Sequence, residues 1–313
     1  LVSNWRPVVL LPVMSRILEG VLMKQMMEYL EEKELIPPSQ HAYRFRKSCL
    51  TAWTDIDVII NRARDEGKAC GMLMTDLAGA FNCVSKETLL PQLRMTGFSL
   101  DNIMLLESYL TNRSNCTRVA SSISRPLPVP TGVGEGSSSG PILWICHILS
   151  SPGVIRKTEK ILEDYEDDSH PAHIPIIRKG TYQIHEATFA DDCNNVVVAE
   201  SNEAVLNIMT VLQDQYSLFF SHLGLKESRA KQQHIIWSKK KEEGNDFLLN
   251  GRKGESSIKL LGIHCSSDYT FEKQATSVIG RMAGRLPHLR KIRDHVSRDV
   301  LIRVSTALCL SIL

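Results

Sequence analysis

Several features that mark common protein classes are missing from this sequence. No stretch of its 313 residues approaches the ~20 consecutive apolar residues that span a bilayer, and no basic segment followed by an apolar one marks a secretory signal peptide. The eight cysteines are scattered and form no CxxC pair, which disfavours zinc ribbons and redox dithiols and indicates a reduced intracellular protein. We find no internal repeat and no low-complexity tract.

The chain also has little net charge. Its 37 Lys and Arg residues nearly balance 35 Asp and Glu residues, which gives a formal charge of +2. A balance near zero still permits a basic groove, so nucleic-acid binding has to be argued from local clusters of charge. An apolar content of 43% and a charged content of 23% are ordinary for a globular protein. The length suits one large domain or a few small subdomains around a shared core.

The order of apolar patterns predicts an α+β fold. Apolar residues at helical spacing between residues 13 and 35, ahead of two prolines, predict an amphipathic helix. Further helices are expected over 50–67, over 86–112 as one or two helices, over 201–223, and from 271 onward with a break at Pro287. Strands are expected over 71–75, 188–190, 195–199 and 258–264. We expect a long connection over 150–181 and a charged loop over 237–254. This order favours an antiparallel sheet over a doubly wound one.

Three aspartates are the candidate catalytic groups. Asp76 directly follows the apolar run 71–75, which is the pattern of a buried strand that places a carboxylate at its end. Asp191 and Asp192 stand between two apolar segments, where a hairpin turn would let both face one site although neighbouring strand residues point to opposite faces. Nucleotide polymerisation uses two Mg²⁺ ions about 3.5–4 Å apart, and Mg²⁺ prefers carboxylate oxygens. An Asp-Asp pair alone is more often a surface turn, so the surrounding residues must supply the specificity.

Seven sequence blocks supply it. In chain order they are NWRPVVLLPVMSRILE, SQHAYRFRKSCLTA, MTDLAGAFNCVSKETLL, GVGEGSSSGPIL, FADD, GLKESRAK and KLLGI. Their order and spacing resemble the successive conserved blocks of reverse transcriptases from non-LTR (LINE-like) retrotransposons. The resemblance extends over roughly residues 4–271.

The resemblance implies a right-hand polymerase with fingers at 1–69, a palm with a ferredoxin-like antiparallel sheet at 70–265, and the start of a truncated helical thumb at 266–313. Residues 84–131 would pack partly with the fingers. The chain starts at Leu1 rather than Met and stops inside an apolar run, so we expect a fragment of a longer open reading frame. The implied partners are an RNA template, a DNA primer and dNTPs, with an endonuclease domain elsewhere in the full-length protein, and the implied locations are nucleus and cytoplasm.

The resemblance also implies roles for individual residues. Asp76, Asp191 and Asp192 would hold two Mg²⁺ ions, with Mn²⁺ as an alternative, and Asp192 would be the weaker ligand. Phe81 matches the aromatic steric gate that occupies the space of a ribose 2′-hydroxyl. The remaining implied contacts are Arg44, Lys47, Glu135, Gly136 and Lys231 with the nucleotide, and Gly262 with the primer terminus. Beyond the last block, Arg281, Arg285, Arg290, Lys291 and Arg293 recur near helical spacing, so we expect them to track a nucleic-acid backbone. A plain solvated helix is the competing interpretation.

Six positions near the predicted site depart from the family pattern. Gly134 and Glu135 stand where Pro-Gln is usual, and a carboxylate at 135 would repel phosphate by ~1 kcal/mol in water and ~4 kcal/mol at an effective dielectric constant of 20. Ala42 and Arg46 replace glycines, at a cost on the order of 1 kcal/mol wherever φ is positive. Phe45 replaces a basic residue, and Asn82 replaces a common Asp that is not a metal ligand.

These departures keep three functions open. The leading hypothesis is an RNA-directed DNA polymerase, a nucleotidyltransferase that serves retrotransposition. The second is a catalytically silent remnant that at most binds nucleic acid. The third is an RNA-dependent RNA polymerase with a similar palm, against which Phe81 argues. Metal-dependent incorporation of dNTP, compared with rNTP, separates all three.

Overall fold

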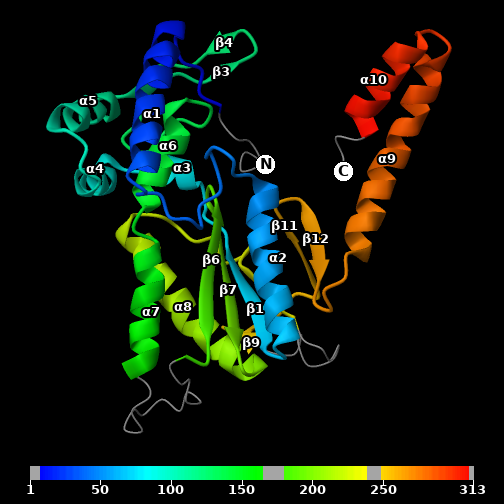
Figure 1. The fold of residues 1–313 in the computed structure, drawn as a ribbon. Coiled ribbons are helices and arrows are strands. Elements are labelled where there is room, and N and C mark those ends of the chain that lie inside the picture. The colour runs from blue at the N-terminus through cyan, green and yellow to red at the C-terminus, as the bar shows by residue number, and fades with distance from the viewer. Residues whose placement is uncertain (1–7, 165–179, 238–247, 310–313) are drawn as a thin grey trace.

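A four-stranded antiparallel sheet forms the centre of the molecule. The computed structural model describes residues 8–164, 180–237 and 248–309. The sheet has the order β6 (Gln183–Phe189), β7 (Asp192–Ala199), β1 (Ala69–Thr75) and β8 (Gln233–Trp237), and every neighbouring pair is antiparallel (Figure 1). Numbered in chain order, the strands are arranged 4-1-3-2 with helices between the first and second and between the third and fourth, which is the ferredoxin-like topology.

Strand β1 is buried on both faces, as its apolar run requires. Successive side chains alternate between the faces, so Met72 packs against α2 (Cys49–Asp65) while Leu73 joins the cluster around α8 (Asn202–His222). Gly71 allows α8 to approach, because a Cβ at this position would lie 2.8 Å from the Met209 side chain and 2.9 Å from that of Val205. The sheet is therefore packed between two helices, and Gly71 is a position at which β1 closely approaches α8.

A helical layer covers the upper end of the sheet in Figure 1. It consists of α1 (Val13–Glu32), α3 (Ala80–Cys83), α4 (Lys86–Met95), α5 (Leu100–Leu110) and α6 (Ser139–Ile148), while α7 (Pro152–Asp164) packs beside α8. Serine side chains cap α2, α4, α5 and α8 by accepting a hydrogen bond from a first-turn amide. Helix α6 is buried along nearly its whole length, so it is the structural centre of this layer.

Short ribbons and a C-terminal helical hairpin complete the fold. The ribbons pair β2 (Ser114–Asn115) with β5 (Leu127–Pro128), β3 (Arg118–Val119) with β4 (Ser122–Ile123), β9 (Leu248–Leu249) with β10 (Arg252–Lys253), and β11 (Ser257–Leu260) with β12 (Ile263–Ser266). Helices α9 (Glu272–Arg293) and α10 (Arg298–Cys309) form the C-terminal hairpin, which projects away from the sheet and has no buried residue within its described part (Figure 1). Within the described residues, no helix is long and apolar enough to cross a membrane.

The predicted α+β class, the antiparallel sheet and the main helices are confirmed. Four details of the sequence-based prediction are wrong. The long connection expected over 150–181 contains α7, whose buried side chains Val154, Thr158 and Leu162 follow a helical spacing. Residues 165–179 of that segment fall outside the described residues. The expected strand at 258–264 is the hairpin β11–β12. The charged loop expected over 237–254 contains the ribbon β9–β10, and its residues 238–247 fall outside the described residues.

The fourth detail concerns Pro287, which was expected to break the last helix. Helix α9 runs through it from Glu272 to Arg293. Proline removes one backbone donor and leaves the carbonyl of Ala283 without its helical partner. Because the helix is exposed along its length, water can hydrate that carbonyl, so the local cost does not end the helix.

Candidate active site

Strand register brings two of the three predicted aspartates together. Asp76 follows β1 and Asp192 begins β7, and Thr75 pairs with Cys193 in the antiparallel ladder. Continuing that register by one residue places Asp76 opposite Asp192, and opposite residues of such a pair have Cα atoms about 4.5–5.5 Å apart with side chains on one face. Asp191 lies in the two-residue turn between Phe189 and Asp192. We call these three aspartates the carboxylate edge.

A pocket of about 380 Å³ opens beside the carboxylate edge. Asp76 and Asp192 line it together with Met74 and Asn194, which lie two residues farther into the sheet on the same face. The hairpin β11–β12 covers another side through Lys259, Leu260 and Leu261. Asp191 is not among the lining residues and lies instead near Tyr43, whose pKa is raised by burial and, to a lesser extent, by the Asp191 charge.

The electrostatics of the carboxylate edge favour a bound cation. Burial raises the pKa of Asp192 above its ordinary value, and the negative charges of Asp191 and Asp76 raise it further. Repulsion among three carboxylates is relieved when one binds a proton or when a cation binds between them.

The donor set fits Mg²⁺. Within the described ranges, no three His, Cys, Asp or Glu side chains form a ready metal cage. Mg²⁺ does not require one, because it is usually held by one or two carboxylates together with water and substrate phosphates. Asp76, Asp191 and Asp192 offer the hard oxygen donors that such a partial site needs.

Backbone pairing places Lys231 beside Asp76. Ser228 donates its amide to the Asp76 carbonyl at 2.8 Å, and Ala78 donates to the Lys226 carbonyl at 2.8 Å. These bonds bring two separate sequence blocks together. The Lys231 Nζ lies 3.3 Å from Asp76 Oδ2, and both side chains are solvent-accessible. The Lys231 charge therefore faces the carboxylate edge.

The turn of the carboxylate edge is held by side chains that the sequence-based prediction did not select. Ala190 has a φ of +56°. Its amide donates to Gln40 Oε1 at 3.1 Å, and its carbonyl accepts from Trp144 Nε1 at 2.8 Å. Gln40 lies in one of the seven blocks and Trp144 in the apolar run behind the glycine-rich loop, but neither residue has a pattern of its own that could have singled it out.

Phe81 lies on α3 and stacks against Trp144, with ring centroids 5.4 Å apart and planes at 29°. Its carbonyl accepts a hydrogen bond of 2.7 Å from Val133 in the glycine-rich loop, which comprises residues 131–140. The ring is partly buried. The predicted gate is thus in contact with the tryptophan that holds the Asp191 turn.

Two departures from the family pattern turn out to be partners. Asn82 Nδ2 donates to Glu135 Oε1 at 3.2 Å. Both line a second pocket of about 280 Å³ together with Gly134 and Val9. Gly136 in the same loop has a φ of +91°, which suits glycine. The Glu135 carboxylate is therefore hydrogen-bonded to a neutral amide and does not stand alone.

The predicted triphosphate contacts lie on the basic loop, which comprises residues 42–47. The Arg44 guanidinium donates to both carboxylate oxygens of Glu31, at 2.8 and 2.7 Å. These hydrogen bonds lower the pKa of Glu31. A further nitrogen of Arg44 donates to the carbonyls of Pro37 and Gln40. Lys47 donates to the carbonyl of Pro38 at 3.2 Å. Arg44 is thus engaged within the protein.

Of the two residues that replace glycines, only one has the positive φ that would make the replacement costly. Arg46 has a φ of +60°, whereas Ala42 is buried with no positive φ. Arg46 therefore has a strained backbone and an exposed guanidinium, which lies 5.2 Å from the Phe45 ring centroid.

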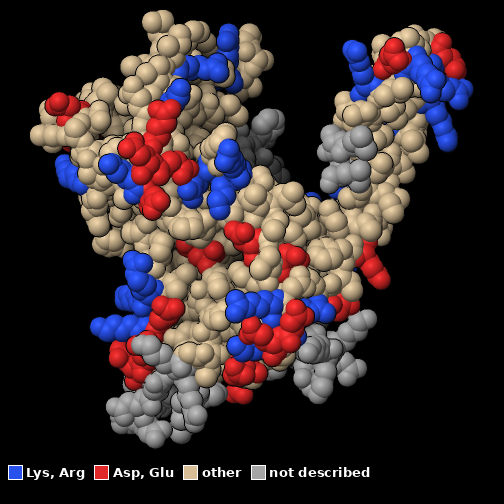
Figure 2. Space-filling view, viewed as in Figure 1, with Lys and Arg blue, Asp and Glu red and all other residues tan. Residues whose placement is uncertain are grey.

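Gly262 and the predicted backbone contacts lie farther along the chain. Gly262 occupies the turn of β11–β12 with a φ of +90°, which gives a conformational reason for glycine, and a Cβ there would meet no protein atom within 4 Å. Arg281, Arg285, Arg290, Lys291 and Arg293 all lie on α9. Figure 2 shows Lys and Arg gathered toward the outer end of the C-terminal hairpin, with some Asp and Glu among them. Arg293 pairs with its neighbour Asp294 at 3.0 Å.

Comparison with known proteins gives consistent matches. The family model described as "Reverse transcriptase (RNA-dependent DNA polymerase)" matches residues 2–265. The probable RNA-directed DNA polymerase from transposon X-element of Drosophila melanogaster is 27% identical over 53% of this chain and 18% of its own length. The Pol polyprotein from the type-1 retrotransposable element R2 of Popillia japonica is 25% identical over 49% and 22%, and the polymerase from the mobile element jockey of Drosophila melanogaster is 20% identical over 88% and 28%. The chain thus spans less than a third of each relative's length.

Among solved structures, apo telomerase from Candida tropicalis truncated from its C-terminal domain matches with a TM-score of 0.51. The identity is 10%, and the match covers 82% of this chain and 45% of the telomerase chain. A second apo telomerase structure from the same organism matches with a TM-score of 0.51 at 9% identity, over 82% and 41% of the two chains. At such identities the likeness concerns the fold alone.

Proposed function

This chain belongs to the reverse transcriptase family and is of the non-LTR retrotransposon kind, and from that premise we propose that it is a polymerase core that copies RNA into DNA. The substrates are an RNA template, a DNA primer and dNTPs. The observation that carries the proposal is the strand register that sets Asp76 opposite Asp192 beside the Asp191 turn.

The carboxylate edge is the proposed catalytic centre. Two Mg²⁺ ions held by Asp76, Asp191 and Asp192 would activate the primer 3′-hydroxyl and neutralise the triphosphate. Lys231, which already faces Asp76, neutralises or protonates the departing pyrophosphate. Phe81 fills the space of a 2′-hydroxyl and thereby favours dNTP over rNTP.

The remaining contacts extend from this centre. Glu135 and Gly136 lie near the template and incoming nucleotide, Lys47 and Arg44 near the triphosphate, and Gly262 at the primer terminus. For Arg44 this role requires that the Glu31 pair opens or is shared with phosphate, because its donors are engaged in the present arrangement. The five basic residues of α9 track the nucleic-acid backbone.

The parts of the molecule follow the right-hand plan. We assign fingers to 1–69, palm to 70–265, with 84–131 packing partly with the fingers, and the start of the thumb to 266–313. The sheet β6-β7-β1-β8 lies within the proposed palm, and the projecting α9–α10 hairpin is the proposed thumb. In the full-length protein an endonuclease domain would supply the nicked DNA that primes synthesis.

A second candidate function is a catalytically silent remnant that at most binds nucleic acid. The state of the basic loop favours it, because Arg44 is tied to Glu31 and Arg46 has a positive φ. Glu135 near the proposed nucleotide site favours it as well. The carboxylate edge argues the other way, since none of its three acids is replaced.

Primer extension separates the two functions. The protein is incubated with a primed RNA template, dNTPs and Mg²⁺, beside the Asp191→Ala variant and a reaction with rNTPs. Weak, Mg²⁺-dependent extension by the wild type, lost in Asp191→Ala and absent with rNTPs, is expected. Equal incorporation by wild type and Asp191→Ala, or none by either, refutes the polymerase proposal.

A further inference from the structure

We propose that Gln40 and Trp144 are positioning residues that hold Ala190 from both sides and thereby set the geometry of Asp191 and Asp192. The proposal rests on the proposed function, because it takes these two acids as metal-holding groups. It concerns two residues that do not face the pocket beside the carboxylate edge.

Ala190 is the residue that needs support. It occupies the first position of the two-residue turn between β6 and β7, with a φ of +56°. Hairpin turns favour glycine where φ is positive, because a Cβ there approaches the backbone. An alanine at this position leaves the turn biased toward other conformations, each of which would move the two acids that follow it.

Gln40 holds the turn from the side of the loop after α1. Its side chain is 2% exposed, and its Oε1 accepts from both Ala190 and Ala42, at 3.1 and 2.9 Å. The backbone around it is joined to β6, since His41 donates to the Thr188 carbonyl at 3.0 Å and Thr188 donates to the Ser39 carbonyl at 2.9 Å. Gln40 therefore cannot shift without moving β6 as well.

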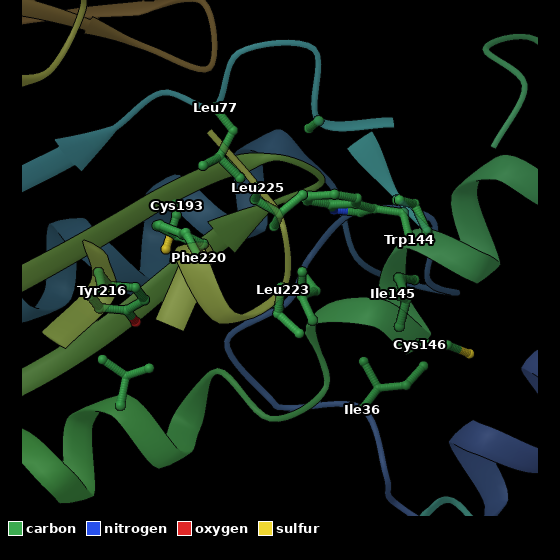
Figure 3. Close-up of a cluster of buried hydrophobic side chains, with 14 of the residues drawn as sticks. Ile36, Leu77, Trp144, Ile145, Cys146, Cys193, Tyr216, Phe220, Leu223 and Leu225 are labelled. Carbon is green, nitrogen blue, oxygen red and sulfur yellow. The ribbon is translucent and has the colours of Figure 1, made fainter. Parts of the chain in front are cut away.

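Trp144 holds the turn from the other side. It is 1% exposed on α6, and its indole N–H donates to the Ala190 carbonyl at 2.8 Å. Figure 3 shows the ring reaching from α6 into the buried cluster toward Leu225. Its stacking on Phe81 links the proposed gate to the same turn. Both polar backbone groups of Ala190 are thus satisfied by buried side chains from separate elements.

The arrangement couples the basic loop to the carboxylate edge. The basic loop begins two residues after Gln40, and Arg44 donates to the Gln40 carbonyl. A change in the basic loop on nucleotide binding would be transmitted through Gln40 to the turn that presents Asp191. The positioning role therefore predicts a defect in kcat and in Mg²⁺ dependence, whereas a purely structural role predicts only a loss of stability.

The test uses Gln40→Leu, which removes the acceptor, and Trp144→Phe, which removes the donor and keeps a stacking ring. We expect each to lower kcat by about 10–100-fold and to raise the Mg²⁺ concentration for half-maximal activity, as changes to groups behind metal ligands do. Adding Ala190→Gly to Gln40→Leu should restore part of kcat, because glycine adopts the positive φ without help. The matched controls are Gln213→Leu, a buried glutamine bonded to Gln232, and Trp53→Phe, a buried tryptophan on α2.

Amide hydrogen exchange supplies a readout that does not depend on activity. The Ala190 amide should be protected in the wild type and should exchange faster in Gln40→Leu, while both controls leave it protected. An unprotected Ala190 amide in the wild type overturns the proposal. The proposal is also overturned if Gln40→Leu and Trp144→Phe fold and match the controls in kcat and Mg²⁺ dependence. It is overturned as well if Ala190→Gly restores no activity to Gln40→Leu.

The positioning role can be tested even if the protein proves to have no polymerase activity. If the wild type incorporates no dNTP, Mn²⁺ binding replaces activity as the readout, with Asp191→Ala as the reference for loss of the site. Weaker Mn²⁺ binding in Gln40→Leu and Trp144→Phe, but not in the controls, supports the positioning role in an inactive protein. Equal binding in all variants, or none in the wild type, overturns it.

Discussion

The carboxylate edge and the basic surfaces differ in how the chain holds them. Asp76 and Asp192 are placed by a ladder of seven residue pairs between β1 and β7, and the Asp191 turn is hydrogen-bonded on both sides by buried side chains. The basic residues instead belong to a loop and a helix outside the sheet: the Arg44 side chain is largely buried against Glu31, while α9 has no buried residue. The backbone that carries the acids is therefore anchored in the core, although the Asp192 side chain itself is exposed, whereas the positions of the basic side chains depend on local pairs such as Arg44 with Glu31.

This difference separates two kinds of change. A substitution in the carboxylate edge should abolish chemistry without unfolding the protein, because the strands persist without the carboxylates. A substitution among the basic residues should act through affinity, or through stability where the residue is engaged within the fold. The predictions below test that separation.

The largest effect is expected for Asp76→Asn. Losing one carboxylate that holds a metal should lower the rate of primer extension roughly 1,000-fold, since metal stabilisation of the transition state is worth several kcal/mol. The unfolding midpoint should change little. Asp101→Asn, an exposed acid in the first turn of α5, is the matched control. A loss of activity in Asp101→Asn as large as that in Asp76→Asn would place the effect outside the carboxylate edge.

The second-largest effect is expected from acid, which should destabilise the helical layer around α6. Burial lowers the pKa of His147 on α6 to about 4 from an ordinary 6.5. The unfolded chain therefore binds a proton that the folded protein resists, and stability present above pH 6.5 is lost as pH falls toward 4, by up to about 3 kcal/mol.

Chemical denaturation between pH 7 and 4.5 measures this effect. His147→Leu should flatten the pH dependence relative to the wild type, whatever its cost in absolute stability. His288→Gln, at an exposed position on α9, should leave the slope unchanged. A slope that persists in His147→Leu would assign the acid sensitivity to another group.

Substitution of Arg44 and of Lys47 by alanine should affect stability differently. Arg44→Ala removes a bidentate partner of Glu31 and should lower the free energy of unfolding by about 1–3 kcal/mol as well as raise KM for dNTP. Lys47→Ala removes a single bond to a carbonyl and should raise KM with little change in stability. Urea denaturation and steady-state kinetics on both variants decide this. A stable Arg44→Ala variant would show that the Glu31 pair contributes little to the fold.

The smallest effect concerns the pair of Asn82 with Glu135. Because the carboxylate is hydrogen-bonded and partly exposed, its repulsion toward phosphate should be near the low end, ~1 kcal/mol or about fivefold in rate. Glu135→Gln should raise activity by that factor. Asn82→Asp should lower activity by setting two carboxylates together, and adding Glu135→Gln to it should restore activity. No gain in Glu135→Gln would make the electrostatic account wrong.

The sequence predicted the parts of the site that follow from strand patterns. The sequence-based prediction correctly placed Asp76 directly after a strand, β1, and the Asp-Asp pair at a hairpin turn, that of β6–β7, because both acids adjoin apolar strand patterns. It could not predict that Arg44 is paired with Glu31 or that Gln40 and Trp144 hold Ala190. Those contacts join residues distant in the chain, and no local pattern encodes them. The catalytic and binding roles of the aspartates and of the basic residues alike stay predictions.

The errors in the fold have physical causes of the same kind. Helix α7 was hidden by Pro152 and Gly153, which resemble a loop although proline suits the first turn of a helix. The β11–β12 hairpin was taken for one strand because its turn consists of Leu261 and Gly262 within an apolar run.

Iron-directed cleavage tests the central claim most directly. With added hydrogen peroxide and ascorbate, Fe²⁺ bound in place of Mg²⁺ reduces the peroxide to hydroxide and a hydroxyl radical, and ascorbate returns the Fe³⁺ to Fe²⁺. The radicals cut the backbone near the metal, and mass spectrometry locates the cuts. We predict cuts both around residue 76 and around residues 190–192, suppressed together by excess Mg²⁺ and lost together in Asp76→Asn. Cuts at only one of the two segments, or cuts that survive in Asp76→Asn, would contradict a metal site shared by β1 and the β6–β7 turn.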